Sequence, residues 1–581
     1  MMHYTDLFHP AVSSLKSFAS RVCRCALYAF LPLAPLASSA ADFFLGADIS
    51  WCTEMEQRGQ KVYNYVGEER EATALMKELG LNAVRLRVWV DPKEHGGWCD
   101  KNDVLVKALR AKALGMEVMI DFHYSDWWAD PGKQNMPAAW AKHKYKEVLQ
   151  DVASHTREVL QLLKDNGVTP RWVQVGNETS AGMLWPMGKI TDGRWRDDNG
   201  KWTKEAQQYA GFFKSGYEAV KEVFPSAQVI VHLDNGYDDL LYNNNLDALR
   251  ENGAKWDVIG MSLYPYWTFK GGYHGSVEQL MGQCINNMNM LVKKYGTDVM
   301  IAETGYKVDD SAPELMEEGR RQLAALIRLC REYTSGRCQG VFYWEPTCRP
   351  KQYELGAFSG EGKPTSIMRA FTMANLKNVT QNGTFLLRSA TQASHGAERY
   401  MVNGTSNGTS DGKSNCTLYM VNGTCPYDRP LVTMHTDKGD IIVELYNETP
   451  KHRDNFLRLM KDGTLNGKPF YRVVKNFVAQ YGIEGDSATL DAEITYPVHL
   501  HWRGVLAAAR RGDEVNPTYR SSATNFYFVW GRNEWDSMPS LDKTYTVFGE
   551  IASGLDVLEE IMAQPEGAPE VRIESPTPAL P

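Results

Sequence analysis

The chain has 581 residues, a hydrophobic content of 43% and a formal net charge of −8. This length predicts two or three domains, and the apolar fraction is enough for packed cores. The balance of 63 Lys and Arg against 71 Asp and Glu argues against nucleic acid or an anionic membrane as the main partner.

The first segment, residues 1–40, has the pattern of an export signal. A basic region precedes an apolar run at 25–36, and small residues follow, so we predict cleavage after Ala40. The apolar run is shorter than the ~20 residues that span a bilayer. We therefore expect an exported protein (periplasmic, at the cell surface or secreted) with no membrane span after cleavage. An uncleaved anchor is the alternative.

Eight of the ten cysteines lie beyond this signal, since Cys23 and Cys25 fall within it. Export permits disulfides, but the sequence does not choose their pairing. The short spacing of Cys416 and Cys425 makes them the simplest pair to connect.

Between residues 42 and about 375, apolar runs alternate with amphipathic stretches. Eight such strand–helix units predict a (β/α)8 barrel. The predicted strands are 43–49, 83–89, 117–123, 172–177, 228–233, 257–263, 298–303 and 340–344. The predicted helices are 68–79, 103–114, 146–164, 204–223, 239–251, 276–294, 313–332 and 364–373.

Polar and aromatic side chains stand at the ends of these strands. In a barrel the strand ends converge on one rim, which is where the active site lies. An aromatic loop, residues 126–131 (DWWADP), adds to this rim, and flat aromatic faces suit sugar rings. From their positions we predict that the substrate is bound in part by Asp48, Trp89, Trp128 and Asn235.

Glu178 stands after the fourth strand and Glu303 at the end of the seventh. One such residue alone is most simply a surface carboxylate, but a pair at these positions favours cleavage of a glycosidic bond, which needs an acid/base and a nucleophile. We assign these roles to Glu178 and Glu303 respectively. Arg87 is predicted to keep Glu303 ionised by proximity, and Asn177 to hold a sugar hydroxyl beside the acid.

Several stretches resemble the endo-β-1,4-galactanases of glycoside hydrolase family 53. They are 44–50 (FLGADIS), 82–89 (NAVRLRVW), 121–131 (DFHYSDWWADP), 173–178 (VQVGNE), 262–265 (SLYP) and 302–306 (AETGY). The resemblance implies a retaining hydrolase of β-1,4-galactan in pectic arabinogalactan. It also implies that the subsite at the bond to be broken is lined by Arg87, His123, Asn177, Tyr264 and Trp344.

We expect no metal and no cofactor. Some bacterial members of that family hold calcium in a long loop after the seventh strand, but here the loop 307–313 is short. Two other functions remain open for the barrel: hydrolysis of another β-linked polysaccharide such as mannan or xylan, and carbohydrate binding without catalysis.

Residues 376–430 have the Gly-, Ser- and Asn-rich composition of a linker. From 431 to about 575 the chain is β-rich. It has a predicted hairpin at 432–446, a helix from Thr449-Pro450 to Met460 and a last helix near 555–562. A small closed barrel with two helices fits this pattern.

This second domain resembles the cyclophilins, which are peptidyl-prolyl cis/trans isomerases. The resemblance lies in 449–456, 470–480 (FYRVVKNFVAQ), 504–510 (GVLAAAR), 525–528 (NFYF) and 545–549 (YTVFG). It implies that Arg472 acts on the prolyl amide, with a proline pocket formed by Phe477, Gln480, Ala508, Asn525 and Tyr527. Asn525 stands where the family usually has Gln, so a peptide-binding module without isomerase activity is the alternative. The partners implied are thus a polysaccharide and proline-containing peptides.

Overall fold

The computed structural model describes residues 43–374, 429–532, 537–565 and 573–577. The predicted export signal, nearly all of the predicted linker, and Cys416 and Cys425 lie outside these residues. Six cysteines fall within the described part, and all six are buried, free thiols.

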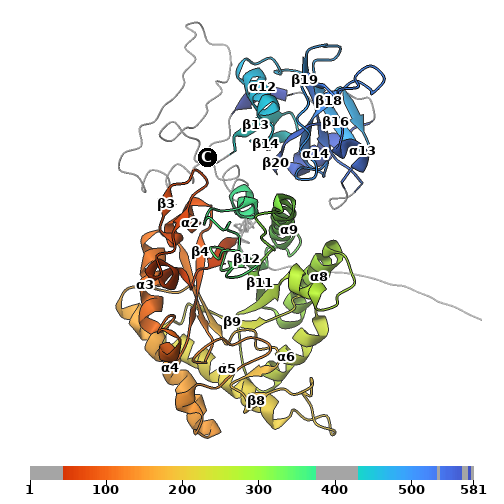
Figure 1. Ribbon diagram of the computed structural model, residues 1–581. Helices are drawn as coiled ribbons and strands as arrows, with labels where there is room; N and C mark the ends of the chain where they lie inside the picture. The colour runs from red at the N-terminus through yellow and green to blue at the C-terminus, as the bar shows by residue number, and fades with distance from the viewer. Residues whose placement is uncertain (1–42, 375–428, 533–536, 566–572, 578–581) are drawn as a thin grey trace, which may run out of the picture. The chain divides into compact units, whose positions relative to one another are not determined.

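Eight parallel strands close into a barrel, which confirms the predicted fold class of the first domain. Each strand pairs with the next along the chain, and the last pairs with the first. Figure 1 shows several of them inside a ring of helices. The strands are β1 (Phe44–Asp48), β4 (Ala83–Val88), β5 (Glu117–Phe122), β6 (Trp172–Val175), β9 (Gln228–Leu233), β10 (Val258–Leu263), β11 (Asp298–Thr304) and β12 (Cys338–Trp344).

Helices connect these strands close to the predicted positions. They are α2 (Ala72–Glu78), α3 (Lys101–Ala113), α4 (Tyr145–Asp165), α5 (Lys204–Val223), α6 (Asp239–Glu251), α8 (Val277–Tyr295), α9 (Pro313–Glu332) and the 3-10 turn η3 (Ser366–Met368). The rim and its loops add α1 (Cys52–Gln57), β2 (Val62–Tyr63), β3 (Glu69–Arg70), η1 (Pro92–His95), η2 (Ala138–Trp140), β7 (Gly182–Met183), β8 (Gly188–Lys189) and α7 (Pro265–Lys270).

The first helix begins later than the predicted residue 68. Residues 69–70 instead form β3, which pairs with β2 in a short hairpin. Glu71 is the helix N-cap, and its carboxylate accepts hydrogen bonds from the backbone N–H groups of Thr73 and Ala74. This cap satisfies N–H groups that a helix cannot pair internally, and it fixes the start of the helix at Ala72.

Inward-facing side chains are stacked in layers inside the barrel. The deepest layer is apolar and takes one residue from each strand: Phe44, Ala83, Met119, Trp172, Ile230, Val258, Met300 and Phe342. Alternation along the strands places the next layer two residues further on. In four of the strands that position is polar: Arg85, Asp121, Gln174 and His232. The barrel therefore has an apolar floor beneath a layer of charged and polar groups.

Regular alternation is interrupted at both predicted catalytic glutamates. Between β10 and β11 the register skips Ala302, so that Ser262 pairs with Glu303 directly after Met261 pairs with Ile301. At the end of β6, Gly176 has a φ of 84° and Glu178 a φ of 46°, both in the left-handed region. This backbone is uncommon for a residue other than glycine and is frequent at functional sites. These two breaks turn both glutamates toward the rim.

The second domain is one curled antiparallel sheet with the strand order β15-β16-β19-β18-β20-β14-β13-β21, and β17 pairs with β19. Within the described residues this sheet is open at β15 and β21, so the predicted closed barrel is corrected to a half-barrel. Its strands are β13 (Leu431–Thr436), β14 (Gly439–Leu445), β15 (Arg472–Val474), β16 (Val478–Gly482), β17 (Thr489–Leu490), β18 (Val505–Arg510), β19 (Ser521–Val529), β20 (Val547–Ser553) and β21 (Ile573–Thr577).

Three helices accompany this sheet: α12 (Pro450–Lys461), α13 (Pro539–Asp542) and α14 (Leu555–Met562). The predicted hairpin and both predicted helices are present. Phe456 of α12 and Ile561 of α14 share one apolar core with Phe526 and Phe528 of β19. A second cluster, which includes Tyr527, covers the opposite face.

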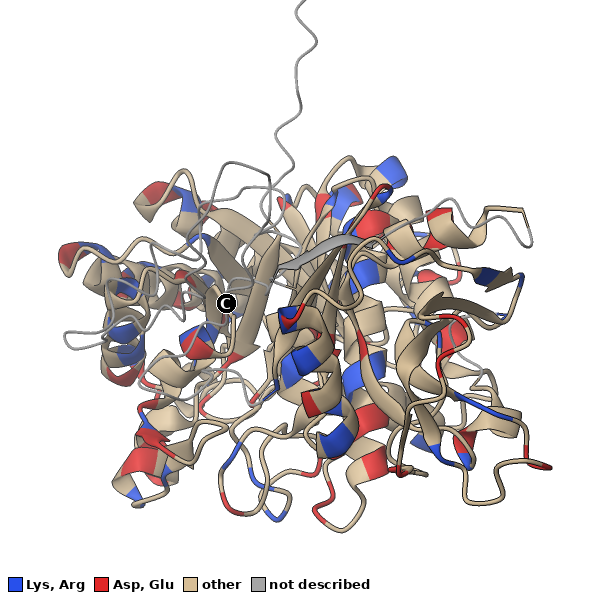
Figure 2. Cartoon of the chain, turned by 90° about the horizontal axis from the view of Figure 1, so that it is seen from above, with Lys and Arg blue, Asp and Glu red and all other residues tan. Residues whose placement is uncertain are grey.

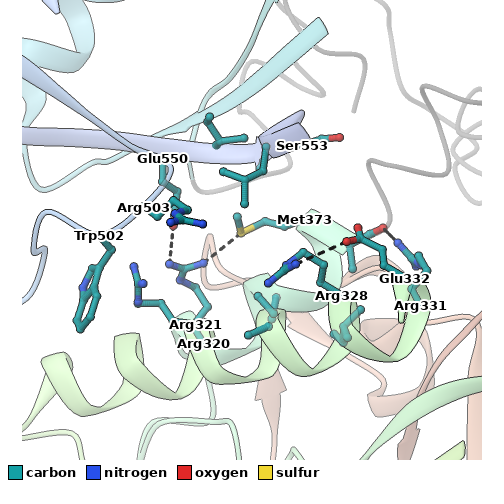
Figure 3. A pocket seen from close by; sticks show the side chains of 18 of the residues that line it. Arg320, Arg321, Arg328, Arg331, Glu332, Met373, Trp502, Arg503, Glu550 and Ser553 are labelled. Carbon is teal, nitrogen blue, oxygen red and sulfur yellow. Dashed lines mark hydrogen bonds and ion pairs between the residues drawn. The ribbon is translucent and has the colours of Figure 1, made fainter. Parts of the chain in front are cut away.

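Acidic and basic side chains are interspersed along the helices (Figure 2). The helix α9 carries Arg320, Arg321, Arg328 and Arg331, which are labelled in Figure 3, and Arg328 pairs with Glu332 one turn later at 3.6 Å. No helix within the described ranges is long and apolar enough to cross a membrane.

Candidate active site

A cleft of about 500 Å3 opens at the ends of the barrel strands and contains both predicted catalytic glutamates. Eight of the predicted site residues line it: His123, Trp128, Asn177, Glu178, Asn235, Tyr264, Glu303 and Trp344. The lining also includes residues without a predicted role, among them Trp51, Asp130, Lys133, Asp234, Ser262, Trp267 and Tyr353.

Glu178 is held from β9 and β10. The Ser262 hydroxyl donates a hydrogen bond to Glu178 Oε1 at 2.6 Å. His232 Nε2 lies 2.9 Å from the same hydroxyl, and the Glu178 backbone N–H donates to His232 Nδ1. Burial, reinforced by the Glu303 and Asp234 carboxylates, holds the pKa of Glu178 well above its ordinary value. Glu178 therefore keeps a proton that it can donate.

Glu303 has different partners. Arg85 Nη1 lies 2.9 Å from Glu303 Oε1, and the Tyr264 hydroxyl donates to Oε2 at 2.8 Å. Burial raises the pKa of Glu303 to about 7, while Arg85 and the bond from Tyr264 oppose this rise. The two carboxyl groups thus have different environments, which is the condition for one to act as an acid and the other as a nucleophile.

Arg85 is the centre of the polar layer beneath the cleft. Its Nη1 is 2.8 Å from Asp48 Oδ2, and its Nη2 is 2.9 Å from Asp121 Oδ2. The same Nη2 donates to Asn177 Oδ1 at 2.7 Å. Asn177 Nδ2 donates one hydrogen bond, to the carbonyl oxygen of Ala129. Asn177 also lines the cleft beside Glu178.

The structure corrects the prediction for Arg87. The arginine beside Glu303 is Arg85, whereas Arg87 pairs with Glu345 at 2.6 Å and approaches Asp48 at 3.5 Å. Both arginines face into the barrel because they are two residues apart on β4, and both are fully buried. Asp48 and Trp89 are likewise buried and do not line the cleft. These three predicted substrate-binding residues lie behind the cleft wall and support it.

One wall of the cleft is aromatic. The rings of Trp51, Trp128 and Trp344 contact one another, with centroids 5.4 to 5.8 Å apart. Tyr353 packs against Trp344 at 4.7 Å. At another part of the lining, Trp267 is 38% exposed, and its indole N–H donates to the Tyr353 hydroxyl at 3.4 Å. These flat rings provide the stacking surfaces that a sugar chain requires.

The polar residues that organise this site include several without a predicted role. Arg85, His232, Asp234 and Ser262 stand at strand ends in the sequence, and that position is their only signal. Gln174 lies within an apolar strand, where an inward-facing polar residue is a signal that alternation can reveal. No signal identified Glu345 as the partner of Arg87. Among the residues that the structure describes, no group of three or more His, Cys, Asp or Glu is arranged to hold a metal ion.

In the second domain, four predicted residues share one face of the sheet. Arg472 pairs with Gln480, and Gln480 pairs with Tyr527, so the three side chains project from the same side. The Arg472 guanidinium lies 5.8 Å from the centre of the Phe477 ring. Arg472 is exposed and Phe477 is half-buried.

Hydrogen bonds link this face to the predicted Asn525 and to two residues that were not predicted, Tyr471 and His501. Gln480 Nε2 donates to the Tyr471 hydroxyl, which donates to Asn525 Oδ1 at 2.8 Å. The Tyr527 hydroxyl lies 3.0 Å from Nε2 of the buried His501. Ala508 differs from the prediction, because it packs in the opposite core with Phe526 and Phe528.

A parallel barrel whose rim cleft combines two carboxyl groups in different environments with an aromatic wall is the architecture of a glycoside hydrolase. Comparison with known proteins agrees: residues 44–390 match the model of glycosyl hydrolase family 53. The chain belongs to this family. Residues 431–577 match the model of the cyclophilin type peptidyl-prolyl cis-trans isomerase/CLD family.

The similarity to the three following relatives extends over the barrel domain. An endo-beta-1,4-galactanase of Bacillus subtilis (strain 168) is 31% identical over 53% of this chain and 71% of that protein. A probable arabinogalactan endo-beta-1,4-galactanase A of Aspergillus terreus is also 31% identical, over 55% and 90%. The solved family 53 catalytic domain of Ignisphaera aggregans is 32% identical over 57% of this chain and 95% of that one, with a TM-score of 0.49.

Proposed function

We propose that the barrel is a retaining endo-β-1,4-galactanase that cleaves the galactan chains of pectic arabinogalactan. The observation that carries the proposal is the placement of Glu178 and Glu303 in one cleft, with the pKa of Glu178 held well above its ordinary value and Glu303 paired with Arg85. Two relatives are named as endo-β-1,4-galactanases, which supports galactan as the substrate.

The reaction follows from these environments. Glu303 attacks the anomeric carbon, while Glu178 donates its proton to the glycosidic oxygen and the bond to that oxygen breaks. A galactosyl ester of Glu303 forms and the leaving chain departs. Glu178, now ionised, takes a proton from water as the water oxygen attacks the anomeric carbon, and Glu303 is released. Asn177 and Tyr264 stand beside the two carboxyl groups.

The test is reducing-sugar release by the full chain from linear galactan, mannan and xylan. Glu178→Gln and Glu303→Gln should each reduce galactan hydrolysis by several orders of magnitude, and the control Glu218→Gln, on the outer face of α5, should not. NMR of the first product should show a β anomer. Release of reducing sugar from mannan or xylan alone would show that the substrate is one of these polysaccharides and not galactan. No release from any of the three would favour a barrel that binds carbohydrate without catalysis.

For the second domain we propose peptidyl-prolyl isomerisation, with proline-containing peptides as partners. The support is the shared face of Arg472, Phe477, Gln480 and Tyr527. A hydrogen bond from Arg472 that weakens amide resonance would lower the ~20 kcal/mol barrier to rotation. A protease-coupled assay should show Arg472→Ala slower than wild type and than Arg458→Ala on α12. Equal rates would favour peptide binding without catalysis.

We also propose export, directed by residues 1–40. The support is the charge and apolar pattern of that segment. Mass spectrometry of the protein isolated from its natural host should give an N-terminus at Ala41. An intact residue 1 in the purified protein would contradict this proposal.

A further inference from the structure

Behind the aromatic wall, Glu345 and Arg87 form an ion pair that does not line the cleft. Both side chains are fully buried. Glu345 Oε1 accepts from Arg87 Nη1 at 2.6 Å and from the backbone N–H of Trp51 at 3.0 Å. The Glu345 backbone N–H donates to the carbonyl oxygen of Asp48 at 3.0 Å. One residue after β12 thus joins the ends of β1 and β4.

The pair has contacts in two directions. On one side, the Arg87 guanidinium lies 4.3 Å from the ring centre of Trp128 and 5.1 Å from that of Trp51, both of which line the cleft. Such cation–π contacts are strongest where water is excluded. Arg87 Nε and Nη2 have no acceptor among the described residues. The position of the guanidinium is therefore set by Glu345 and by the indole rings.

In the other direction, a row of alternating charges leads to the nucleophile. It runs from Glu345 to Arg87 (2.6 Å), from Arg87 to Asp48 (3.5 Å), from Asp48 to Arg85 (2.8 Å) and from Arg85 to Glu303 (2.9 Å). Asp48 gives a different oxygen to each arginine. Burial raises the pKa of Glu345 to about 8, while the Arg87 guanidinium and the Trp51 N–H oppose this rise. Without the charge on Glu345, Arg87 is a buried cation whose remaining ion pair is with Asp48 at 3.5 Å. An incompletely paired buried cation is costly, so Arg87 would be drawn toward Asp48.

The backbone at Glu345 points to the same conclusion. Its φ of 44° lies in the left-handed region, as does that of Glu178 at 46°. Such a conformation is strained for a residue with a side chain and persists where its surroundings hold it. Here two hydrogen bonds hold it, one to the carbonyl oxygen of Asp48 at the end of β1 and one from the N–H of Trp51 in the turn that follows.

We propose that Glu345 is a positioning residue of the hydrolase: through Arg87 it fixes Trp51 and Trp128 of the sugar-binding wall, and through Asp48 it keeps Arg85 on Glu303. The proposal rests on hydrolysis in this cleft. Glu345 touches neither the cleft nor the reacting atoms. Its effect is on the placement of groups that do.

The variant Glu345→Gln keeps the size of the side chain and can still accept from Trp51, but it removes the charge that holds Arg87. We expect kcat/KM on galactan to fall by about 10- to 100-fold, the scale of loss for small misplacement of catalytic groups. Because the wall and the nucleophile are both affected, KM should rise and kcat should fall. The matched control is Asp298→Asn, which removes a carboxylate from an arginine pair at the opposite end of β11.

Two further measurements separate positioning from a purely structural role. In the folded variant without substrate, the near-UV circular dichroism of the tryptophans should change while the far-UV spectrum does not. In a double-mutant cycle, Glu345→Gln together with Arg87→Gln should lose little more activity than Arg87→Gln alone, since Glu345 acts through Arg87. Arg87→Lys, which keeps the charge without the flat guanidinium, serves as the test if Glu345→Gln does not fold.

The outcomes are distinct. Values of kcat and KM within about twofold of the control, together with an unchanged near-UV spectrum, would overturn the positioning role. Additive losses of activity in the double-mutant cycle would overturn it as well. If the wild type did not cleave galactan, the proposed substrate would fail, but the spectral comparison would still decide the role of Glu345. A spectral change with unaltered KM and kcat on a cleaved polysaccharide would also overturn the proposal.

Discussion

At the scale of single residues, the site depends on which arginine reaches which carboxylate. Arg85 and Arg87 have the same parity on β4, so both face inward, and the sequence could not show which of them lies at the height of Glu303. The strand-end position of Glu178 and Glu303 could be predicted, because polar residues that follow an apolar strand are visible as a pattern. The backbone irregularities at Gly176 and Ala302, which orient these two glutamates, could not be predicted, because they arise from the pairing between strands.

The hydrogen bond from Tyr264 to Glu303 gives a prediction of pH dependence. The bond favours the carboxylate and lowers the pKa of Glu303, which burial otherwise raises to about 7. Hydrolysis needs Glu303 ionised, so activity is lost as pH falls through this pKa. In Tyr264→Phe the pKa should rise, and the acidic limb of kcat/KM should move to higher pH by about one unit.

The acidic limb of kcat/KM is measured with galactan as the substrate. The control is Tyr273→Phe, whose half-buried hydroxyl donates to Gln283 and does not line the cleft. An acidic limb that stays in place would show that the Tyr264 hydroxyl does not set the ionisation of Glu303.

At the scale of elements, the barrel strands were predictable because parallel strands buried on both faces are continuous apolar runs. The first helix was misplaced at its start, because the polar residues 69–70 are as compatible with a helix as with a hairpin. In the second domain, the strands and helices were recognisable. The sequence did not show how far the sheet closes, because closure depends on pairing between strands that are distant in sequence.

The helix α4 carries a histidine whose burial predicts acid sensitivity. His155 packs against Phe122, Tyr124 and Trp140. Burial lowers its pKa to about 4. The unfolded chain, with a His pKa near 6.5, binds this proton at higher pH than the folded chain does. Folding stability is therefore lost as pH falls from about 6.5 to about 4, by about 3 kcal/mol in total.

His155→Phe removes this proton uptake. Urea unfolding at neutral pH and near pH 4.5 should show that the variant loses less stability on acidification than the wild type. His143 is the contrasting control. Its hydrogen bond to Asp151 raises its pKa, so its contribution to folding stability increases as the pH falls. An equal loss in the wild type and His155→Phe would mean that other groups govern the acid sensitivity.

At the scale of the whole molecule, each candidate site is built from residues of its own core. The barrel core and the core of the second domain are separate apolar clusters. Glu178, Glu303 and their partners all lie within residues 48–303, whereas Arg472, Gln480 and Tyr527 belong to β15, β16 and β19. The two proposed activities should therefore be separable by point substitution.

In the full chain, Arg472→Ala should leave galactan hydrolysis within about twofold of wild type, and Glu303→Gln should leave prolyl isomerisation equally unaffected, as expected for independent sites. Both assays are run on the same preparations. A loss of hydrolysis in Arg472→Ala at unchanged stability would reveal coupling between the sites.

The apolar floor of the barrel has a consequence for the movement of protons. One hydrophobic side chain from each strand separates the charged layer from the far end of the barrel, so the layer exchanges protons with solvent on the cleft side. In the proposed mechanism, a polysaccharide bound in the cleft would close that route. Glu178 would then donate to the leaving oxygen the proton that it already held when the polysaccharide bound, and the pH of the solution would act on the enzyme before binding.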